Sequence, residues 1–582
     1  MKIMINNIKK LIFGLGVGCG IAVGFTACSD TWDDHYESTS TIAGEGTIWE
    51  AISSNPELSN FASVLKACDF DQALNSSQVF TVFAPTNANC SKADADALIQ
   101  EYNEQKGKVS DDENTVIKEF VRNHVALYNY SVSKAHNDTI TLMNGKYAVL
   151  QTDRIDKTPF EKANQLYSNG VLFITEKPVA YFPNVFEYFR KDADFDSVRS
   201  FLYSEWFYRS VFQPRLSVAG GIENGKTVYL DSVFRQTNVL FDVLEDINSE
   251  DSTYWMVAPT NEQWKALVDE YSQYFVYEDN VGRYLTEGTV DSLIYTAPRL
   301  AILRGTVFNR TFNSDAAIPD SVMSTNSVYR YNWRSMLWGA DTLCYYQYFR
   351  PNDEGGVFSG ATATECSNGQ VMKVPTWNFA KEQTFFQTRI IEAEGGASIR
   401  EVSKEETNAT TKDSTVTISA VIRNVNSDNP FYNKVSNNRF VEFAPNLTTR
   451  NHYVLFNISN VLSNIGYDIY LVTAPALAAD TTATVEQRLP TIMTCTLNYR
   501  DKKGDSKTMT LGGQFTTSPD EVQYVKLAEN FKFPVCTTGI SEGSNTSVSL
   551  KVETNVTSRQ QRNKTHTRTM RIDCIVLKPH VE

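Results

Sequence analysis

The residue types that most often perform acid–base or nucleophilic chemistry are few and widely spaced in this chain of 582 residues. Its six histidines include no two at the spacing of metal ligands on one element, and neither His-Glu-x-x-His nor Cys-x-x-Cys occurs. A glycosidase needs only two carboxylates, however, and the 68 acidic residues leave that alternative open. We therefore predict a protein that acts by binding and is not an enzyme, without a catalytic cofactor, and we keep glycoside hydrolysis as the remote alternative.

One cysteine is placed for covalent attachment of a lipid. Three lysines precede the apolar run of residues 11–27, and Cys28 follows that run directly. This pattern is typical of a secretory signal with a cleavage site, and the run is short for the alternative, an uncleaved membrane helix. The site resembles the lipobox of bacterial lipoproteins. The acidic stretch of residues 29–34, Ser-Asp-Thr-Trp-Asp-Asp, resembles the export signal of Bacteroidota lipoproteins. An ordinary solvated linker is the alternative. The resemblance implies a lipid anchor on Cys28 and a place on the cell surface, at the outer membrane.

Charge and cysteine usage exclude further classes of function. The net charge is −14, and because the predicted signal carries lysines and no acids, the mature chain is more acidic still. Nucleic acid is therefore not an expected partner. The remaining cysteines are irregularly spaced, which argues against zinc and redox sites, so we expect most of them to be buried. A disulfide between Cys68 and Cys90, or between Cys344 and Cys366, stays open.

A motif that occurs twice predicts the elements that must position any site. Residues 81–87 read Thr-Val-Phe-Ala-Pro-Thr-Asn, and residues 254–261 read Tyr-Trp-Met-Val-Ala-Pro-Thr-Asn. In both, an apolar run suited to a buried strand meets a proline and then Thr-Asn, which are good residues for a helix N-cap. The pattern predicts a buried strand that turns directly into a helix, once in each copy of a duplicated domain.

A second motif follows each copy of the first. Residues 168–174 read Ser-Asn-Gly-Val-Leu-Phe-Ile, and residues 367–374 read Ser-Asn-Gly-Gln-Val-Met-Lys-Val. Two motifs in the same order, twice, resemble the fasciclin-like family, and the resemblance implies two α+β fasciclin-like domains. It also implies that His124 is a buried structural histidine. We place Arg304 at the equivalent position of the second copy, which argues against a reaction common to both copies.

The second copy is longer than the first in two aromatic-rich places, around residues 202–246 and between Arg304 and Asn368. These rings either pack an enlarged core or form an exposed platform for a sugar ring or a protein partner. Since added material is free to carry function, we expect the ligand or partner site here. The candidate binding residues are Trp206, Tyr331, Trp333, Trp338 and Tyr346.

The pattern of residue types changes after Pro375, where short β-prone runs alternate with polar turns. Such runs predict an all-β sandwich. Residues 390–394, 440–443 and 570–579 resemble, in that order, the first, middle and last strands of galactose-binding-like jelly-roll modules, a fold common among carbohydrate-binding modules. The last tryptophan of the chain is Trp377, which argues against direct glycan binding by this domain. The predicted strands are residues 416–422, 439–443, 453–458, 467–472, 492–499, 547–552 and 570–577.

The jelly-roll resemblance also implies a metal. Acidic residues on the opening and closing strands of such modules often hold a structural calcium ion, and Glu392, Glu394 and Asp573 are the candidates. Their oxygens are hard ligands of the kind that calcium prefers. The alternative is that the two glutamates are simply solvated or bonded to the backbone.

These resemblances together predict a multidomain surface lipoprotein that acts by binding. Proteins of this kind in Bacteroidota accompany a TonB-dependent transporter pair of the SusC and SusD type, so an accessory role in uptake of a glycan or a peptide is implied. A cell-surface adhesin is the main alternative. The predicted organisation is a signal peptide at 1–27, a lipidated acidic linker at 28–45, fasciclin-like domains at 46–180 and 181–378, and a β-sandwich at 379–582.

Overall fold

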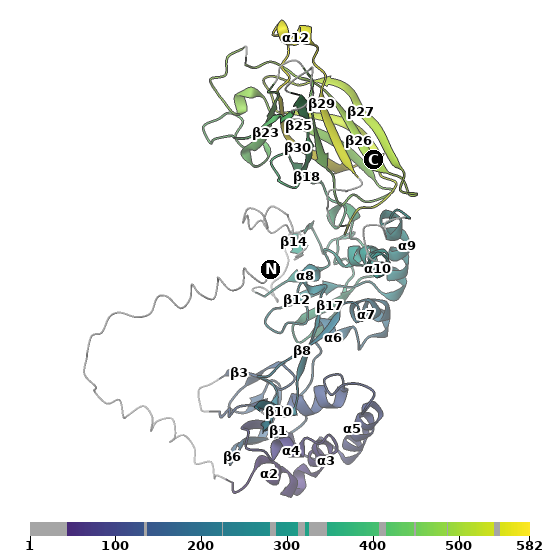
Figure 1. Cartoon of the computed structure of the whole chain (residues 1–582). Coiled ribbons are helices and arrows are strands. Elements are labelled where there is room, and N and C mark those ends of the chain that lie inside the picture. The colour runs from purple at the N-terminus through teal and green to yellow at the C-terminus, as the bar shows by residue number, and fades with distance from the viewer. Residues whose placement is uncertain are drawn as a thin grey trace, which may run out of the picture. The chain divides into compact units, whose positions relative to one another are not determined.

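The computed structural model describes the chain from residue 44 to residue 581, with internal gaps (Figure 1). The described residues are 44–132, 137–223, 225–279, 287–311, 321–324, 346–406, 415–446, 450–485, 487–540 and 548–581. They form two compact units. Unit 1 runs to Tyr181 and also includes Phe212–Phe234, whereas unit 2 comprises Phe182–Val211 and everything from Arg235 onward. The predicted domain boundaries stay predictions.

The first copy of the duplicated motif lies in unit 1 and is an α+β domain built on a seven-stranded sheet. Its central strands β1 (Phe80–Pro85) and β7 (Gly170–Thr175) are parallel, with Phe80 opposite Gly170, and every residue of both is buried. In the order β2-β1-β7-β6-β5-β4-β3, the other strands are β2 (Val125–Leu127), β3 (Asp138–Thr141), β4 (Tyr147–Leu150), β5 (Arg154–Ile155) and β6 (Thr158–Tyr167).

Helices cover one face of this sheet (Figure 1). Val82 and Leu172 pack into the core beneath the helices, while Phe83 and Phe173 stack on the opposite face, 5.3 Å apart. Burial on both faces is why the two motifs are continuous apolar runs and do not alternate. The α-helices are α2 (Ile48–Ser54), α3 (Ser59–Ala67), α4 (Asp71–Leu74) and α5 (Lys92–Gln105).

The second copy repeats this core in unit 2, with the order β13-β12-β17-β16 matching β2-β1-β7-β6. Strand β12 (Tyr254–Val257) lies parallel to β17 (Gly369–Lys373), with Tyr254 opposite Gly369. The predicted direct turn from strand to helix is present in this copy, because Thr260 caps α9 (Asn261–Tyr271). In the first copy the prediction is wrong, because a turn follows β1 and α5 begins only at Lys92, where Ser91 is the N-cap. The other elements of this region are α6 (Val185–Tyr188), α7 (Asp196–Leu202), α8 (Phe241–Leu244), α10 (Glu287–Leu303), β8 (Tyr208–Phe212), β11 (Phe234–Asn238), β13 (Val307–Asn309), β14 (Ser321–Ser324), β15 (Tyr346–Phe349) and β16 (Thr362–Cys366).

Strand register corrects the predicted alignment of the two copies. Val307 stands opposite Met256 just as Val125 stands opposite Val82, so Val307 is the counterpart of Val125. The counterpart of His124 is therefore Thr306 and not Arg304. Thr306 is fully buried, and its hydroxyl donates to the carbonyl of Leu303 at 2.8 Å, so a small hydroxyl replaces the imidazole.

The C-terminal part of unit 2 consists of a six-stranded and a five-stranded sheet. Every predicted run contributes a strand, whereas β19, β20, β27 and β28 were not predicted. The six-stranded sheet contains β18 (Arg389–Glu392), β22 (Ser419–Asn424), β23 (Arg439–Ala444), β25 (Gly466–Thr473), β28 (Gln523–Lys532) and β30 (Met570–Pro579). The five-stranded sheet contains β19 (Ile399–Val402), β24 (Tyr453–Asn457), β26 (Ile492–Arg500), β27 (Ser506–Thr516) and β29 (Ser549–Thr554), while β20 (Lys404–Glu406) pairs with β21 (Thr415–Thr417).

Candidate binding site

Trp206 is the predicted site residue whose side chain the structure describes in full. It follows α7 at the start of the first insertion and leaves 48 % of its surface exposed. Its ring meets Tyr295 of α10 edge-on, with centroids 5.1 Å apart and planes at 90°, and it also lies edge-on to Phe207 at 6.3 Å. Phe201 and Phe207 are buried beneath and contact each other at 5.4 Å. The indole is therefore an exposed ring held in place by a buried aromatic layer.

A guanidinium completes this aromatic cluster. The Cζ atom of Arg299 lies 3.9 Å from the centre of the Tyr295 ring, and Nη1 donates to the carbonyl oxygen of Tyr295 at 2.8 Å. Partial burial lowers the pKa of Arg299. Because the ordinary pKa of arginine is very high, the guanidinium nevertheless stays charged at neutral pH. Trp206, Tyr295 and Arg299, named here the Trp206 cluster, combine apolar ring surface with a planar cation.

The other predicted binding residues fall in the second insertion. Tyr331, Trp333 and Trp338 lie outside the described residues. Tyr346 begins β15 and pairs in register with Ser324 of β14. The structure thus places Trp206 alone of the five in a described side-chain environment.

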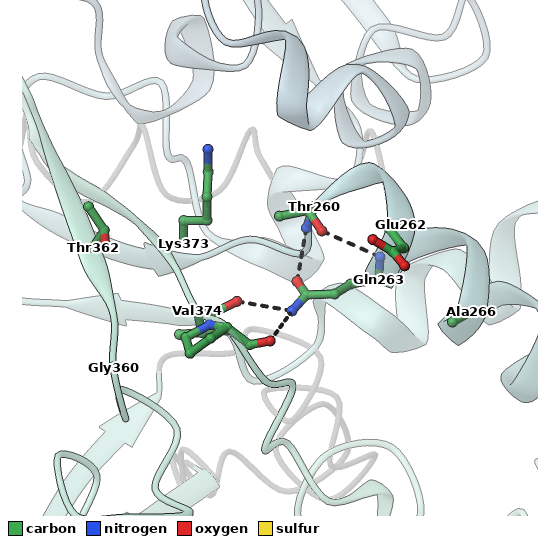
Figure 2. Close-up of a pocket in the computed structure, with 9 residues that line it drawn as sticks. Thr260, Glu262, Gln263, Ala266, Gly360, Thr362, Lys373 and Val374 are labelled. Atoms are coloured by element: carbon green, nitrogen blue, oxygen red, sulfur yellow. Dashed lines mark hydrogen bonds between the residues drawn. The ribbon is translucent and has the colours of Figure 1, made fainter.

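A groove of about 590 Å³ lies where α9 begins, beside the start of β16 and the end of β17. Figure 2 shows Gln263 at its centre, where Nε2 donates to the carbonyl oxygens of Val374 at 3.0 Å and Pro375 at 3.4 Å. Lys373 extends away from Gln263 and pairs with Asp194 and Asp192, and the hydrogen bond to Asp194 raises the pKa of Lys373. Ligand pockets are usually lined by apolar and aromatic side chains, and this groove has little of either. The Trp206 cluster is the better candidate. The full lining is Thr260, Glu262, Gln263, Ala266, Gly360, Thr362, Lys373, Val374 and Pro375.

Two of the three predicted calcium ligands are brought together. The ligand atoms of Glu392, Asp573 and Cys574 all lie within 4.8 Å of one another, and the three residues are buried. Ser436 bridges the two carboxylates, because its hydroxyl donates to Glu392 at 2.6 Å and its backbone N–H donates to Asp573 at 3.0 Å. Glu394 is outside this group and accepts from the Asn437 amide at 3.4 Å.

The chemistry of this donor set fits a hard cation only in part. Two neighbouring buried carboxylates repel each other unless a proton or a cation neutralises them, and their oxygens suit calcium. The thiol of Cys574 is a soft ligand and does not suit it. Glu392 and Asp573 are therefore the residues that would hold calcium.

A second group, Asp468, Glu529 and His580, was not predicted. Its members are far apart in the sequence, so no spacing could have revealed it. Asp468 accepts from Nδ1 of His580 at 2.8 Å, and Lys526 supplies positive charge 3.0 Å from Glu529 and 3.6 Å from Asp468. Lys526 therefore balances one of the two negative charges of this group.

One catalytic pattern that the sequence prediction overlooked is discounted by its structural setting. Residues 220–227 read Gly-Gly-Ile-Glu-Asn-Gly-Lys-Thr and match the pattern of a phosphate-binding loop. That loop must join a strand to a helix, whereas here β9 (Val218–Glu223) is followed by β10 (Lys226–Asp231) in an antiparallel hairpin. The helix N-terminus that would receive the phosphate does not follow.

The cysteines are buried more often than not, as predicted. Cys68 and Cys90 are buried free thiols, so the bridge between them is not formed, and burial raises the pKa of Cys68 to about 12. Cys366 is half-buried and Cys344 lies outside the described residues, so a bridge between these two stays a prediction. Among the described residues, no helix is both long enough and apolar enough to cross a membrane.

Comparison with known proteins supports the first of the two copies at the level of sequence. Residues 56–179 match the family model of the fasciclin domain. No curated protein matches the chain.

Solved structures are similar to parts of the chain at low identity. The FAS1 domain pair of the insect cell adhesion molecule Fasciclin I is 10 % identical, with 56 % of this chain and 98 % of that chain covered and a TM-score of 0.18. A CBM22 xylan-binding domain from Paenibacillus barcinonensis is 8 % identical, with 33 % and 95 % covered and a TM-score of 0.20.

A CBM22 and GH10 module pair of a Clostridium thermocellum xylanase, complexed with xylohexaose, is also 8 % identical with a TM-score of 0.20. Here 33 % of this chain matches only 28 % of that chain. Similarities of this size identify no ligand. The chain has an α+β N-terminal region that matches the fasciclin domain at residues 56–179, followed by regions rich in β-sheet.

Proposed function

We propose that the protein binds a glycan or a peptide through the Trp206 cluster and does not catalyse a reaction on it. The observation that carries this proposal is the exposed indole of Trp206, fixed by Tyr295 above a buried aromatic layer. Exposure of so large an apolar ring is unfavourable in water, and such rings often become the centre of a contact. Because its neighbours already hold the ring, little side-chain entropy is lost when a ligand covers it.

The same cluster supplies polar recognition. The guanidinium of Arg299 stays charged, and its planar N–H groups suit hydroxyl, carbonyl or carboxylate oxygens. A sugar ring presents an apolar face and a rim of hydroxyls, and an extended peptide presents side chains and carbonyls. Both ligand classes therefore match this pairing of ring and cation.

The setting of this function is also proposed. The protein would be a lipoprotein anchored through Cys28 on the outer face of the outer membrane, where it would serve a SusC and SusD type transporter pair as an accessory. The second copy would be a second fasciclin-like domain, since its sheet order and register repeat those of the first. The C-terminal sheets would be a jelly-roll module, in which a structural calcium ion held by Glu392 and Asp573 would join the first and last strands.

Binding by single variants of the purified mature chain tests the ligand site. Xylan, the ligand of the similar CBM22 xylan-binding domain, is the first glycan to try, followed by a panel of other glycans and peptides. Trp206→Ala should weaken binding by roughly thirtyfold, corresponding to about 2 kcal/mol. Tyr524→Ala removes an even more exposed aromatic ring from β28 and is the control. Equal affinity of the Trp206 variant and the parent for every ligand would place the site elsewhere.

The two binding roles, uptake and adhesion, separate in a second experiment. If the protein serves a transporter pair, that pair should be encoded beside it and should co-purify with it from detergent-solubilised outer membranes. If it is an adhesin, cells that lack it should lose attachment to a coated surface and keep normal growth on every glycan and peptide. Release of new reducing ends from a bound glycan would contradict both roles and favour the glycosidase.

A further inference from the structure

A segment of the second copy is folded into the first. The hairpin of β9 and β10 belongs to unit 1 together with the rest of residues 212–234, although the chain has already entered unit 2 before it. Val218 at the start of β9 is fully buried in the helix-side core of the first copy. The backbone N–H of Ala219 donates to Oε1 of Gln78 at 3.1 Å. The contact is thus both apolar and polar.

The strongest contact between this segment and the first copy is a buried cluster of three charged side chains: Arg122, Asp112 and Asp231. Arg122 is 1 % exposed and begins the short 3-10 helix Arg122–His124 that leads into β2. Its Nη2 and Nε donate to the two oxygens of Asp231 at 2.5 and 3.0 Å, and its Nη1 donates to Asp112 at 2.7 Å. Asp112 also accepts from the backbone N–H of Phe234 at 2.8 Å. Asp231 and Phe234 come from the segment 212–234, whereas Arg122 and Asp112 belong to the first copy.

We propose that residues 212–234 complete the fold of the first copy, so that this copy is not a self-sufficient domain. Arg122 is the receptor residue and Asp231 the anchor. Without the hairpin, the buried guanidinium would keep Asp112 alone and the core would lose Val218. A buried charge that loses its partner is strongly destabilising, far more than a surface pair. The inserted segment is therefore a structural clasp of unit 1, whereas the Trp206 cluster belongs to unit 2.

The test uses the full mature chain and hydrogen exchange read peptide by peptide. In Asp231→Asn the bidentate pair is weakened while the side-chain shape is kept. We expect exchange to rise at least tenfold both in the hairpin and in residues 112–124, and the melting midpoint of unit 1 to fall by about 5 °C or more. Asp153→Asn is the matched control, since Asp153 is exposed and pairs with exposed Arg154 in the same copy. The Asp153 variant should change neither the hydrogen exchange of these segments nor the melting midpoint of unit 1.

Each outcome decides the proposal. Loss of protection throughout unit 1, with unit 2 still protected, would support it most strongly, even if unit 1 of the variant does not fold. Opening of the hairpin alone, with residues 112–124 protected as in the parent, would show that the first copy folds without its clasp and would overturn the proposal. So would unchanged exchange in both segments.

Discussion

Asn368 in the second copy makes the same three hydrogen bonds that Asn169 makes in the first. Asn169 accepts from the N–H of Ile48 at 2.8 Å and donates to the carbonyls of Leu74 and Ser76 at 2.8 and 2.9 Å. Asn368 accepts from Val185 at 2.8 Å and donates to two carbonyls at 2.9 and 2.8 Å. Each asparagine thus ties the first helix of its copy, and the chain ahead of the first central strand, to the start of the parallel strand pair.

Replacing either asparagine by alanine should destabilise only the unit that contains it. The change leaves one buried N–H and two carbonyls without their partner, which should cost about 3 kcal/mol or more. Unfolding followed by hydrogen exchange distinguishes the units: Asn169→Ala should affect unit 1 and Asn368→Ala unit 2. Each variant is the control for the other. A uniform loss of protection in both units from either change would show that neither asparagine stabilises its own unit alone, and would contradict the prediction.

His124 should make unit 1 sensitive to acid. It is fully buried, Nε2 accepts from the N–H of Val179 at 2.9 Å, and Nδ1 therefore carries the proton that it donates to the carbonyl of Phe120 at 2.7 Å. Burial lowers the pKa of His124 to about 4 from 6.5. Between these values the unfolded chain binds a proton that the folded chain excludes, so stability is complete above pH 6.5 and falls as the pH drops toward 4, by about 3 kcal/mol in all.

The measurement is denaturant unfolding of unit 1 at pH 4.5 and 7. His124→Gln replaces the buried, hydrogen-bonded imidazole, so the variant should be less stable at pH 7. Because glutamine does not titrate in this range, the variant should lose less free energy of unfolding on acidification. His452 in unit 2 is the internal reference, because burial lowers its pKa to about 4 as well and the substitution leaves it intact. An equal acid loss in parent and variant would rule out His124 as the cause.

Removal of calcium should lower the melting midpoint of unit 2 and leave unit 1 unchanged. A ligand present at a hundred times its Kd stabilises the folded state by about 2.7 kcal/mol. Glu392→Gln combined with Asp573→Asn should abolish the difference between calcium and chelator. Asp468→Asn is the control: it removes a carboxylate from the other acidic group, and the variant should still melt at a higher temperature with calcium than with chelator. Identical melting of the parent with calcium and with chelator would mean that the two carboxylates share a proton instead.

Cys28→Ala should release the protein from the outer membrane. The lipid would be attached to the cysteine sulfur, so the variant should carry no palmitate label and should fractionate with soluble proteins. Ser29→Ala, one residue further on, is the control and should stay membrane-bound and labelled. A Cys28 variant that remains labelled in the membrane would disprove the anchor.

The sequence revealed those strands that carry a strong apolar signal. β1, β7, β12 and β17 were predictable because a central strand pair buried on both faces needs a continuous apolar run. Each of the seven runs predicted for the C-terminal sheets also contributes a strand. The strands missed there are β19, β20, β27 and β28. Of these, β27 and β28 lie at sheet edges with mostly exposed side chains, so neither burial nor alternation marks them.

Long-range pairings were beyond the sequence. Trp206 was predicted from its residue type and its place in an insertion, but its neighbour Tyr295 is far away along the chain, and no local pattern links the two. Asp231 looked like any surface acid, and Arg122 like any basic residue beside an apolar stretch. Their partnership arises only when the insertion folds back onto the first copy.

The hairpin makes the chain pass between the two units three times, before Phe182, before Phe212 and before Arg235. A protease that cuts once near Tyr181 would therefore not set the distal part free. The fragment beginning at Phe182 would keep its own β9 and β10 inserted in the N-terminal fragment, with Asp231 still bound to Arg122. In a lipid-anchored protein, such a nicked molecule would stay on the cell as two chains. A single cut just after Phe234 would not release unit 2 either, because Phe182–Val211 of that unit would remain on the anchored fragment.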